Sequence, residues 1–316
     1  MPRARQLTVL TGGVGGARFL RALSPLIDPA ALTVIANTAD DEEFFDLHVS
    51  PDLDTALYTL AGRAHRRHGW GVHGDSFACL ATLGALGAPT WFQLGDRDLA
   101  VHLLRTVWLR RGVPLSEVTA RLARAHGLQS RLLPMTDDRV RTFVRTARGC
   151  LAFQAYLVRD RARHRVRGIT VAGARRARPA PGVLAALHPS RDVVIAPSNP
   201  LVSIGPILAI PGVRAALRRR RGRTVAISPL VGGRAVRGPL HRMLAGLGRT
   251  PGALAVARLY RDVIDAFVID RADAGAAPAI AALGVRPVVT DILMSTPRRA
   301  RRLAATVLRA LDGAAQ

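Results

Sequence analysis

The chain has 316 residues, 49% of them hydrophobic, which suits a folded protein with a large core and does not suit a disordered chain. Its formal net charge is +24, which could indicate nucleic-acid binding. However, every basic residue is arginine and none is lysine, so a GC-rich coding bias is an equally good explanation of the charge. Because only 4% of the residues are aromatic and able to stack on bases, we expect no nucleic acid partner.

Short apolar runs rich in β-branched residues alternate with longer amphipathic segments, a pattern typical of a parallel sheet covered by helices. The predicted strands are residues 7–10, 32–36, 193–196, 224–227, 266–269 and 287–289. The predicted helices are residues 17–26, 54–60, 76–86, 99–111, 115–125, 213–219 and 297–311. We therefore predict an α/β fold with a doubly wound, mostly parallel, Rossmann-like sheet.

The stretch from residue 131 to residue 171 breaks this rhythm. Its two strand-like runs, VRTFVRTA and CLAFQAYLV, are separated by Gly149. We therefore predict a smaller α+β module inserted into a single α/β domain that spans residues 1–316. The Arg/Ala/Pro/Gly-rich segment 172–182 follows and is expected to be a surface linker.

Two further features indicate the compartment. No uninterrupted apolar stretch is long enough to cross a bilayer, and MPRARQLTVLTGG does not resemble a cleavable signal sequence, so we expect a cytoplasmic protein with no membrane partner. Cys79 and Cys150 form no CxxC pattern. We expect them to be buried structural thiols rather than zinc ligands or a disulfide.

The segment TGGVGGARFL, residues 11–20, joins the first predicted strand to the first predicted helix. Such a turn gathers backbone N–H groups and the positive end of a helix, which suits a diphosphate. Its glycines fit neither register of the dinucleotide fingerprint, so plain NAD binding is disfavoured. Gly12, Gly13 and Gly15 are candidate phosphate ligands, and Arg18 could add a fork of donors. A tight turn without a ligand is the alternative.

Four aspartates follow the second predicted strand. Asp40 and Asp41 lie at its end in NTADDEEFFD, and Asp52 and Asp54 lie in SPDLDT at the next helix start. Ligands of open α/β sheets bind outside the carboxyl ends of the strands, and carboxylates there can hold a magnesium ion that completes its octahedron with phosphate oxygens. The alternative is that Asp52 or Asp54 caps a helix.

A third polar segment is WFQLGDRDLAVHLLR, residues 91–105. It places Asp96, Arg97 and Asp98 before a helix, and Trp91 and Phe92 could face a flat ring. A capped helix with a solvated arginine is the alternative.

A fourth is APSNPLVSIGPIL, residues 196–208, which leaves a predicted buried strand. It offers Ser198, Asn199 and Ser203 between prolines that stiffen the loop, an arrangement that suits hydrogen bonding to a base or a phosphate. A rigid connector is the alternative.

Seven segments of the chain, taken in order, resemble the 2-phospho-L-lactate transferase family of coenzyme F-420 biosynthesis. These are TGGVGGARFL, NTADD, SPDLDTALYTLAG, GWGVHGDSF, LGDRDLAVHLLR, LLPMTDD and PSNPLVSIGPIL, and they cover the first two-thirds of the chain. The resemblance implies transfer of a phosphorylated small acid (phospholactate, phosphoenolpyruvate or phosphoglycerate) from a GDP-linked donor. The acceptor would be the hydroxyl of the deazaflavin alcohol Fo, with GMP released and Mg²⁺ as the cofactor.

The resemblance also implies roles for particular residues. Asp54 would contact Fo and the metal, and Asp40 would be a second metal ligand, so both are expected to be catalytic. We expect Gln93 and Arg97 to bind substrate, with Gln93 touching Fo. The expected ligands of the guanosine diphosphate part are Gly12, Gly13, Gly15, Ser198 and Asn199. A homodimer is the default expectation for the assembly.

Two other classes of protein compete with a transferase. A related family with a similar glycine loop consists of regulatory proteins that bind nucleotides or nucleotide sugars, but the SPDLDT and GDRD motifs are not expected in it. A nucleic-acid-binding protein is indicated by charge alone.

Overall fold

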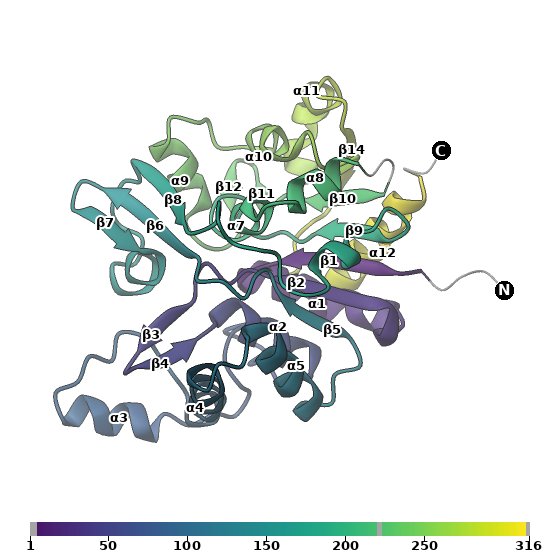
Figure 1. Cartoon of the computed structure of the whole chain (residues 1–316). Coiled ribbons are helices and arrows are strands. Elements are labelled where there is room, and N and C mark those ends of the chain that lie inside the picture. Colours follow the sequence, from purple (N-terminus) through teal and green to yellow (C-terminus); the bar gives the residue numbers. More distant parts are fainter. Residues whose placement is uncertain (1–4, 220–222, 314–316) are drawn as a thin grey trace.

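The computed structural model describes residues 5–219 and 223–313, and in them seven parallel strands form the main sheet (Figure 1). These are β1 (Leu7–Thr11), β2 (Leu32–Ala36), β5 (Arg131–Pro134), β9 (Asp192–Ile195), β10 (Thr224–Ile227), β13 (Ala266–Asp270) and β14 (Arg286–Thr290). Their order is β14-β13-β10-β9-β1-β2-β5. The central strands are continuous apolar runs buried on both faces, as parallel strands usually are. The predicted α/β fold is confirmed.

Helices cover both faces of this sheet, and α3 lies apart from it beside α4 (Figure 1). The helices of the described residues are α1 (Gly13–Leu23), α2 (Pro51–Leu60), α3 (Ala78–Ala85), α4 (Asp96–Arg110), α5 (Leu115–Ala125), α6 (Val183–Ala186), α7 (Ile204–Ala209), α8 (Val213–Arg218), α9 (Leu240–Gly246), α10 (Ala253–Tyr260), α11 (Ala277–Ala281) and α12 (Pro297–Asp312). Short 3-10 turns cover Ser24–Leu26, Pro29–Ala31 and Arg271–Ala276.

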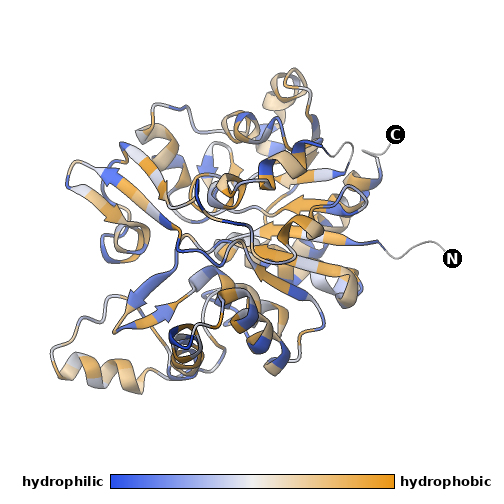
Figure 2. Ribbon diagram, in the orientation of Figure 1, coloured by the Kyte–Doolittle hydropathy of each residue, from blue (hydrophilic) through white to orange (hydrophobic). Residues whose placement is uncertain are grey.

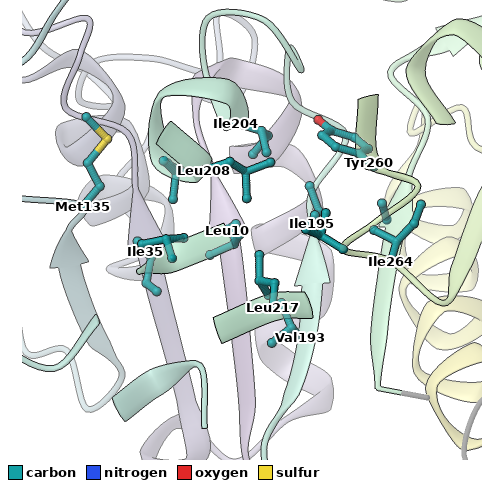
Figure 3. Close-up of a cluster of buried hydrophobic side chains, with 14 of the residues drawn as sticks. Leu10, Ile35, Met135, Val193, Ile195, Ile204, Leu208, Leu217, Tyr260 and Ile264 are labelled. Atoms are coloured by element: carbon teal, nitrogen blue, oxygen red, sulfur yellow. The ribbon is translucent and has the colours of Figure 1, made fainter. Parts of the chain in front are cut away.

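Alternate residues of each strand feed two separate cores. In β9, Val193 and Ile195 pack in the core that includes α7, α8 and α10, whereas Val194 packs in the core that includes α1, α2, α5 and α12. Figure 3 shows the first of these cores, with Leu10 of the adjacent strand β1 between Ile195 of β9 and Ile35 of β2. The period-2 alternation of side chains thus produces the double winding.

All six predicted strands are present, with each end within one residue of its predicted position. The seven predicted helices are also present, but three begin earlier than expected: α1 at Gly13, α2 at Pro51 and α4 at Asp96. In each case the sequence predicted a turn before the helix, and the glycine, proline or polar residues of that predicted turn form the first turn of the helix. Pro51 is favoured there because the first helical N–H has no intrahelical acceptor.

The segment around residues 131–171 differs in part from the expectation. An antiparallel sheet, ordered β7-β6-β8, is formed by β6 (Arg141–Thr146), β7 (Gly149–Ala152) and β8 (Gly168–Ala172). The second predicted strand continues from β7 into a π-helix, η3 (Ala155–Arg159). Strand β5 pairs with β2 at the edge of the main sheet, so the small sheet begins at Arg141 rather than at residue 131. The division into one domain with an inserted module stays a prediction.

Two small hairpins complete the described strands: β3 (Glu42–Phe44) pairs with β4 (Leu47–Val49), and β11 (Leu230–Val231) pairs with β12 (Arg234–Ala235). No helix of residues 5–219 and 223–313 combines the length and the apolar character that crossing a membrane requires.

Two smaller expectations need correction. Segment 172–182 connects β8 to α6 and six of its eleven residues are exposed, but it is anchored to the protein, because Ala174, Ala177 and Ala180 are buried in the core that includes α7. Cys79 and Cys150 are both exposed rather than buried. Cys79 lies in α3, which is mostly hydrophobic and yet largely exposed (Figure 2).

The chain reverses its direction of travel across the sheet beside β1. It continues from β1 to β2 and β5 on one side, and later adds β9, β10, β13 and β14 on the other. The crevice outside the carboxyl ends of β1 and β9 is therefore the topological switch point, where open α/β sheets bind ligands.

Replacing Phe267, which is completely buried in β13, with alanine should lower the free energy of unfolding by about 3–5 kcal/mol, because it leaves a cavity between sheet and helices. Urea denaturation measures this loss. Val289→Ala is the matched control, since Val289 is 44% exposed on the edge strand β14. A loss below about 1 kcal/mol for Phe267→Ala would contradict the packing described here.

Candidate active site

A cavity of about 760 Å³ opens at the switch point and is lined by segments from both halves of the sheet. Eight of the nine predicted site residues line it: Gly12, Gly13, Gly15, Asp40, Asp54, Gln93, Ser198 and Asn199. Arg97 does not. Its side chain is exposed, with Nη1 3.5 Å from the carbonyl oxygen of His73, and its backbone N–H donates to Asp75 at 2.8 Å.

The glycine turn is held against the loop that follows β9. Gly13 has φ +66°, a conformation that favours glycine, and a Cβ on Gly15 would lie 2.5 Å from the carbonyl oxygen of Pro197. The Gly12 N–H donates to Ser198 Oγ at 3.2 Å. Two segments that are more than 180 residues apart in the sequence thus form one corner of the cavity.

Asp52 lies in α2, but its side chain caps the N-terminus of α1. The Gly13 N–H donates to Asp52 Oδ1 at 2.6 Å, and Asn37 Nδ2 donates to Oδ2 at 2.9 Å. Burial raises the pKa of Asp52 to about 6, and these two hydrogen bonds oppose the rise. The helix-cap alternative therefore holds for Asp52, although the helix concerned is α1. The N–H groups of Val14 and Gly15, in the same first turn, also lack helical acceptors.

Asp40 is a buried carboxyl group with an incomplete set of partners. Its Oδ1 has no hydrogen-bond partner among the described residues, and its backbone carbonyl accepts from Gln154 Nε2 at 3.3 Å. Burial and the neighbouring Asp52 carboxylate raise the pKa of Asp40 well above its ordinary value. A cation bound beside Asp40 would favour its charged form, so the site fits a positively charged ligand.

A buried charge network surrounds Asp54, and its members Tyr58, Asp98 and His102 also line the cavity. Both terminal nitrogens of Arg105 donate to the Asp54 carboxylate, Nη1 to Oδ2 at 3.0 Å and Nη2 to Oδ1. His102 lies between two carboxylates, with Nδ1 3.6 Å from Asp54 Oδ2 and Nε2 3.3 Å from Asp98 Oδ1. The Tyr58 hydroxyl donates to Asp98 Oδ1 at 2.6 Å. Polar side chains of α4 thus hold Tyr58 and Asp54 of α2 in place.

The protonation of this network follows from its contacts. Burial alone would lower the pKa of Arg105, but the paired Asp54 carboxylate outweighs burial and raises it. Burial alone would raise the pKa of Asp98, but the nearby His102 ring and the hydrogen bond from the Tyr58 hydroxyl turn this into a net decrease. Arg105 is therefore a cation and Asp98 an anion within the protein interior.

The sequence motif contained this network, but its role was not predicted. Asp98, His102 and Arg105 are spaced i, i+4 and i+7, which places them on one face of a helix. That face is buried here, while Leu103 and Leu104 on the other side are about half exposed. The i, i+4, i+7 spacing of three ionisable residues was the available signal.

The carboxylates could hold a metal ion in two ways. Asp54, Asp98 and His102 each offer a ligand atom within 4.8 Å of the others, so this buried group could bind one. Asp40 offers the unpartnered Oδ1 and lines the same cavity as Asp54. Carboxylate oxygens suit hard cations such as Mg²⁺ and Ca²⁺, whereas imidazole nitrogen suits transition metals.

Aromatic rings form one wall of the cavity. Phe44 of β3 stacks on Phe92 with ring centroids 4.1 Å apart, and Trp91 meets Phe44 edge-on at 5.0 Å. Trp91 and Phe92 of this cluster line the cavity, and so does Trp70, which stacks on His68 in another segment. The wall formed by Trp91 and Phe92 offers flat apolar surface to the cavity that the carboxylates also line.

Comparison with known proteins agrees with this geometry. The family described as 2-phospho-L-lactate transferase CofD matches residues 7–309. The phosphoenolpyruvate transferase of Streptomyces griseus is 44% identical over 296 residues, 92% of this chain and 93% of that protein. The 2-phospho-L-lactate transferase of Methanosarcina mazei is 34% identical over 304 residues, 96% of this chain and all of that protein.

A crystal structure of a member of the UPF0052 family from Bacillus halodurans shares the fold. It has a TM-score of 0.61 and 16% sequence identity, and the match covers 98% of this chain and 100% of that one. The family match spans nearly the whole chain, and the predicted motifs meet at one cavity. The chain therefore belongs to the 2-phospho-L-lactate transferase CofD family of transferases.

Proposed function

We propose that this transferase moves a phosphorylated small acid from a GDP-linked donor to the hydroxyl of Fo and releases GMP, as a step in coenzyme F-420 biosynthesis. The observation that carries the proposal is the convergence of the glycine turn, the Ser198–Asn199 loop and the carboxylates Asp40 and Asp54 on one cavity. The names of the relatives support phospholactate and phosphoenolpyruvate as acids.

The reaction exchanges the phosphoanhydride bond of the donor for a phosphodiester bond to Fo. The Fo hydroxyl attacks the phosphorus nearer the acid and gives up its proton to solvent, and the bond from that phosphorus to the bridging oxygen breaks, so that GMP leaves with this oxygen. We assign Asp54 the role of orienting the hydroxyl, because Arg105 holds both carboxylate oxygens and so sets their direction before substrate binds. The aromatic wall supports a place for the deazaflavin ring, next to Gln93.

We assign Mg²⁺ to Asp40 and Asp54. We also predict that the enzyme is cytoplasmic and homodimeric. Bound Mg²⁺ would neutralise charge on the transferred phosphate. We assign Asp98 and His102 a supporting role beside Asp54, because Mg²⁺ prefers oxygen ligands and the imidazole nitrogen of His102 suits transition metals instead.

Mass spectrometry of reactions containing Fo, Mg²⁺ and each GDP-linked donor should find Fo carrying the phospho-acid, with one GMP per product. Asp54→Asn should abolish this product, since it removes the orienting carboxylate and leaves Arg105 unpaired. A wild-type protein that binds the donor and forms no product would instead support the regulatory nucleotide-binding alternative.

Mg²⁺ should raise the melting temperature of the wild-type protein by several degrees, because an ion at one hundred times its Kd stabilises the folded state by about 2.7 kcal/mol. Asp40→Asn should remove most of this increase. Glu43→Gln is the matched control, since Glu43 is exposed on β3 and does not line the cavity. An unchanged increase in Asp40→Asn would remove Asp40 from the metal site.

Arg105→Met should lower the free energy of unfolding by about 3–5 kcal/mol, because it leaves the buried Asp54 charge unpaired. Arg105→Lys keeps the charge but loses the bidentate contact with Asp54. We therefore expect this variant to fold and its kcat to fall at least about tenfold. Arg110→Lys, on the exposed side of the same helix, should match the wild type. Full activity in Arg105→Lys would contradict the positioning role.

A further inference from the structure

Two arginines from distant parts of the chain line the cavity near the glycine turn. Arg18 lies in α1, and Arg237 lies between β12 and α9. Within residues 5–219 and 223–313, neither forms an ion pair with a carboxylate. Both charges are therefore uncompensated by acidic side chains in the protein as described.

The two guanidinium groups are close enough to repel each other. Burial lowers the pKa of Arg18, and Arg237 is the next largest cause of the decrease, ahead of Arg21. Like charges held together in a cavity raise the free energy of the empty site, and a bound anion relieves this cost. The Arg18–Arg237 pair is thus electrostatically suited to an anionic ligand.

Arg237 is held in place by the segment that covers the glycine turn. Its Nη1 donates to the carbonyl oxygen of His68 at 2.9 Å and its Nη2 to that of Arg67 at 3.5 Å, which leaves the remaining three of its five N–H groups for a ligand. Next along this segment, a Cβ on Gly69 would lie 2.5 Å from Val14 Cγ1. Arg237 is therefore tethered to backbone that contacts the glycine turn, whose residues line the same cavity.

We propose that Arg18 and Arg237 clamp the diphosphate of the bound nucleotide from two sides, together with the N–H groups at the start of α1. This inference rests on the proposed function for the identity of the nucleotide. A guanidinium group can donate two parallel hydrogen bonds to phosphate oxygens. Two arginines from different elements restrain the diphosphate more than a single arginine would. The carboxylate of the transferred acid is the other anion that the pair could meet, and GDP alone separates the two.

Isothermal titration calorimetry with guanosine, GMP and GDP tests the clamp on the folded full-length protein. Arg237→Gln and Arg18→Gln should each raise the Kd for GDP about tenfold or more, the effect of losing one charged hydrogen-bonding group. The Kd for guanosine should change less than about twofold, since guanosine has no phosphate. Arg234→Gln removes the same charge from the nearby hairpin, outside the cavity lining, and should bind GDP as the wild type does.

The outcomes separate the clamp from the proposed function. Wild-type GDP affinity in Arg237→Gln, or an equal loss of guanosine affinity, overturns the clamp and leaves the transferase proposal standing if product is still formed. If both variants lose GDP affinity and the wild-type protein forms no product, the clamp is supported and the transferase proposal is contradicted. Thermal melting of each variant confirms that it is folded, and absence of GDP binding by the wild type contradicts both.

Discussion

The buried contact between Arg105 and Asp54 is the interaction on which the rest of the site depends. Removing a guanidinium and a carboxylate from water costs several kcal/mol for each ion, and only well-directed hydrogen bonds offset that cost. Here both terminal nitrogens of Arg105 meet both oxygens of Asp54. The pair therefore contributes direction more than stability, because it aims a cavity-lining carboxylate that a free side chain would let rotate.

This contact also explains the unusual orientation of α4. The helix turns Asp98, His102 and Arg105 inward and leaves Leu103 and Leu104 about half exposed, the reverse of an ordinary surface helix. Such an arrangement is costly unless the inward charges are paired. The pairing with Asp54 and Tyr58 supplies that condition, so α4 is joined to α2 through the polar side chains of the site.

Much of the fold could be predicted from the sequence because the central strands are continuous apolar runs, and glycine spacing located the turn after β1. The short strand β5 could not be predicted, because its sequence, RLLP, has only two apolar residues between an arginine and a proline. The inward face of α4 was missed because charged residues on a helix usually face water. Arg237 was missed because nothing in its neighbourhood distinguishes it among 46 arginines, and its role emerges only where the chain brings it close to Arg18.

The central claim is that a divalent cation bound by Asp40 and Asp54 faces a diphosphate held at the glycine turn. A crystal grown with GDP and Mn²⁺, which gives an anomalous X-ray signal and shares the oxygen-ligand preference of Mg²⁺, tests it most directly. We expect one anomalous peak between these two carboxylates, in contact with phosphate oxygens beside Gly13 and Gly15. A peak between Asp98 and His102, or a nucleotide bound outside this cavity, would contradict the account.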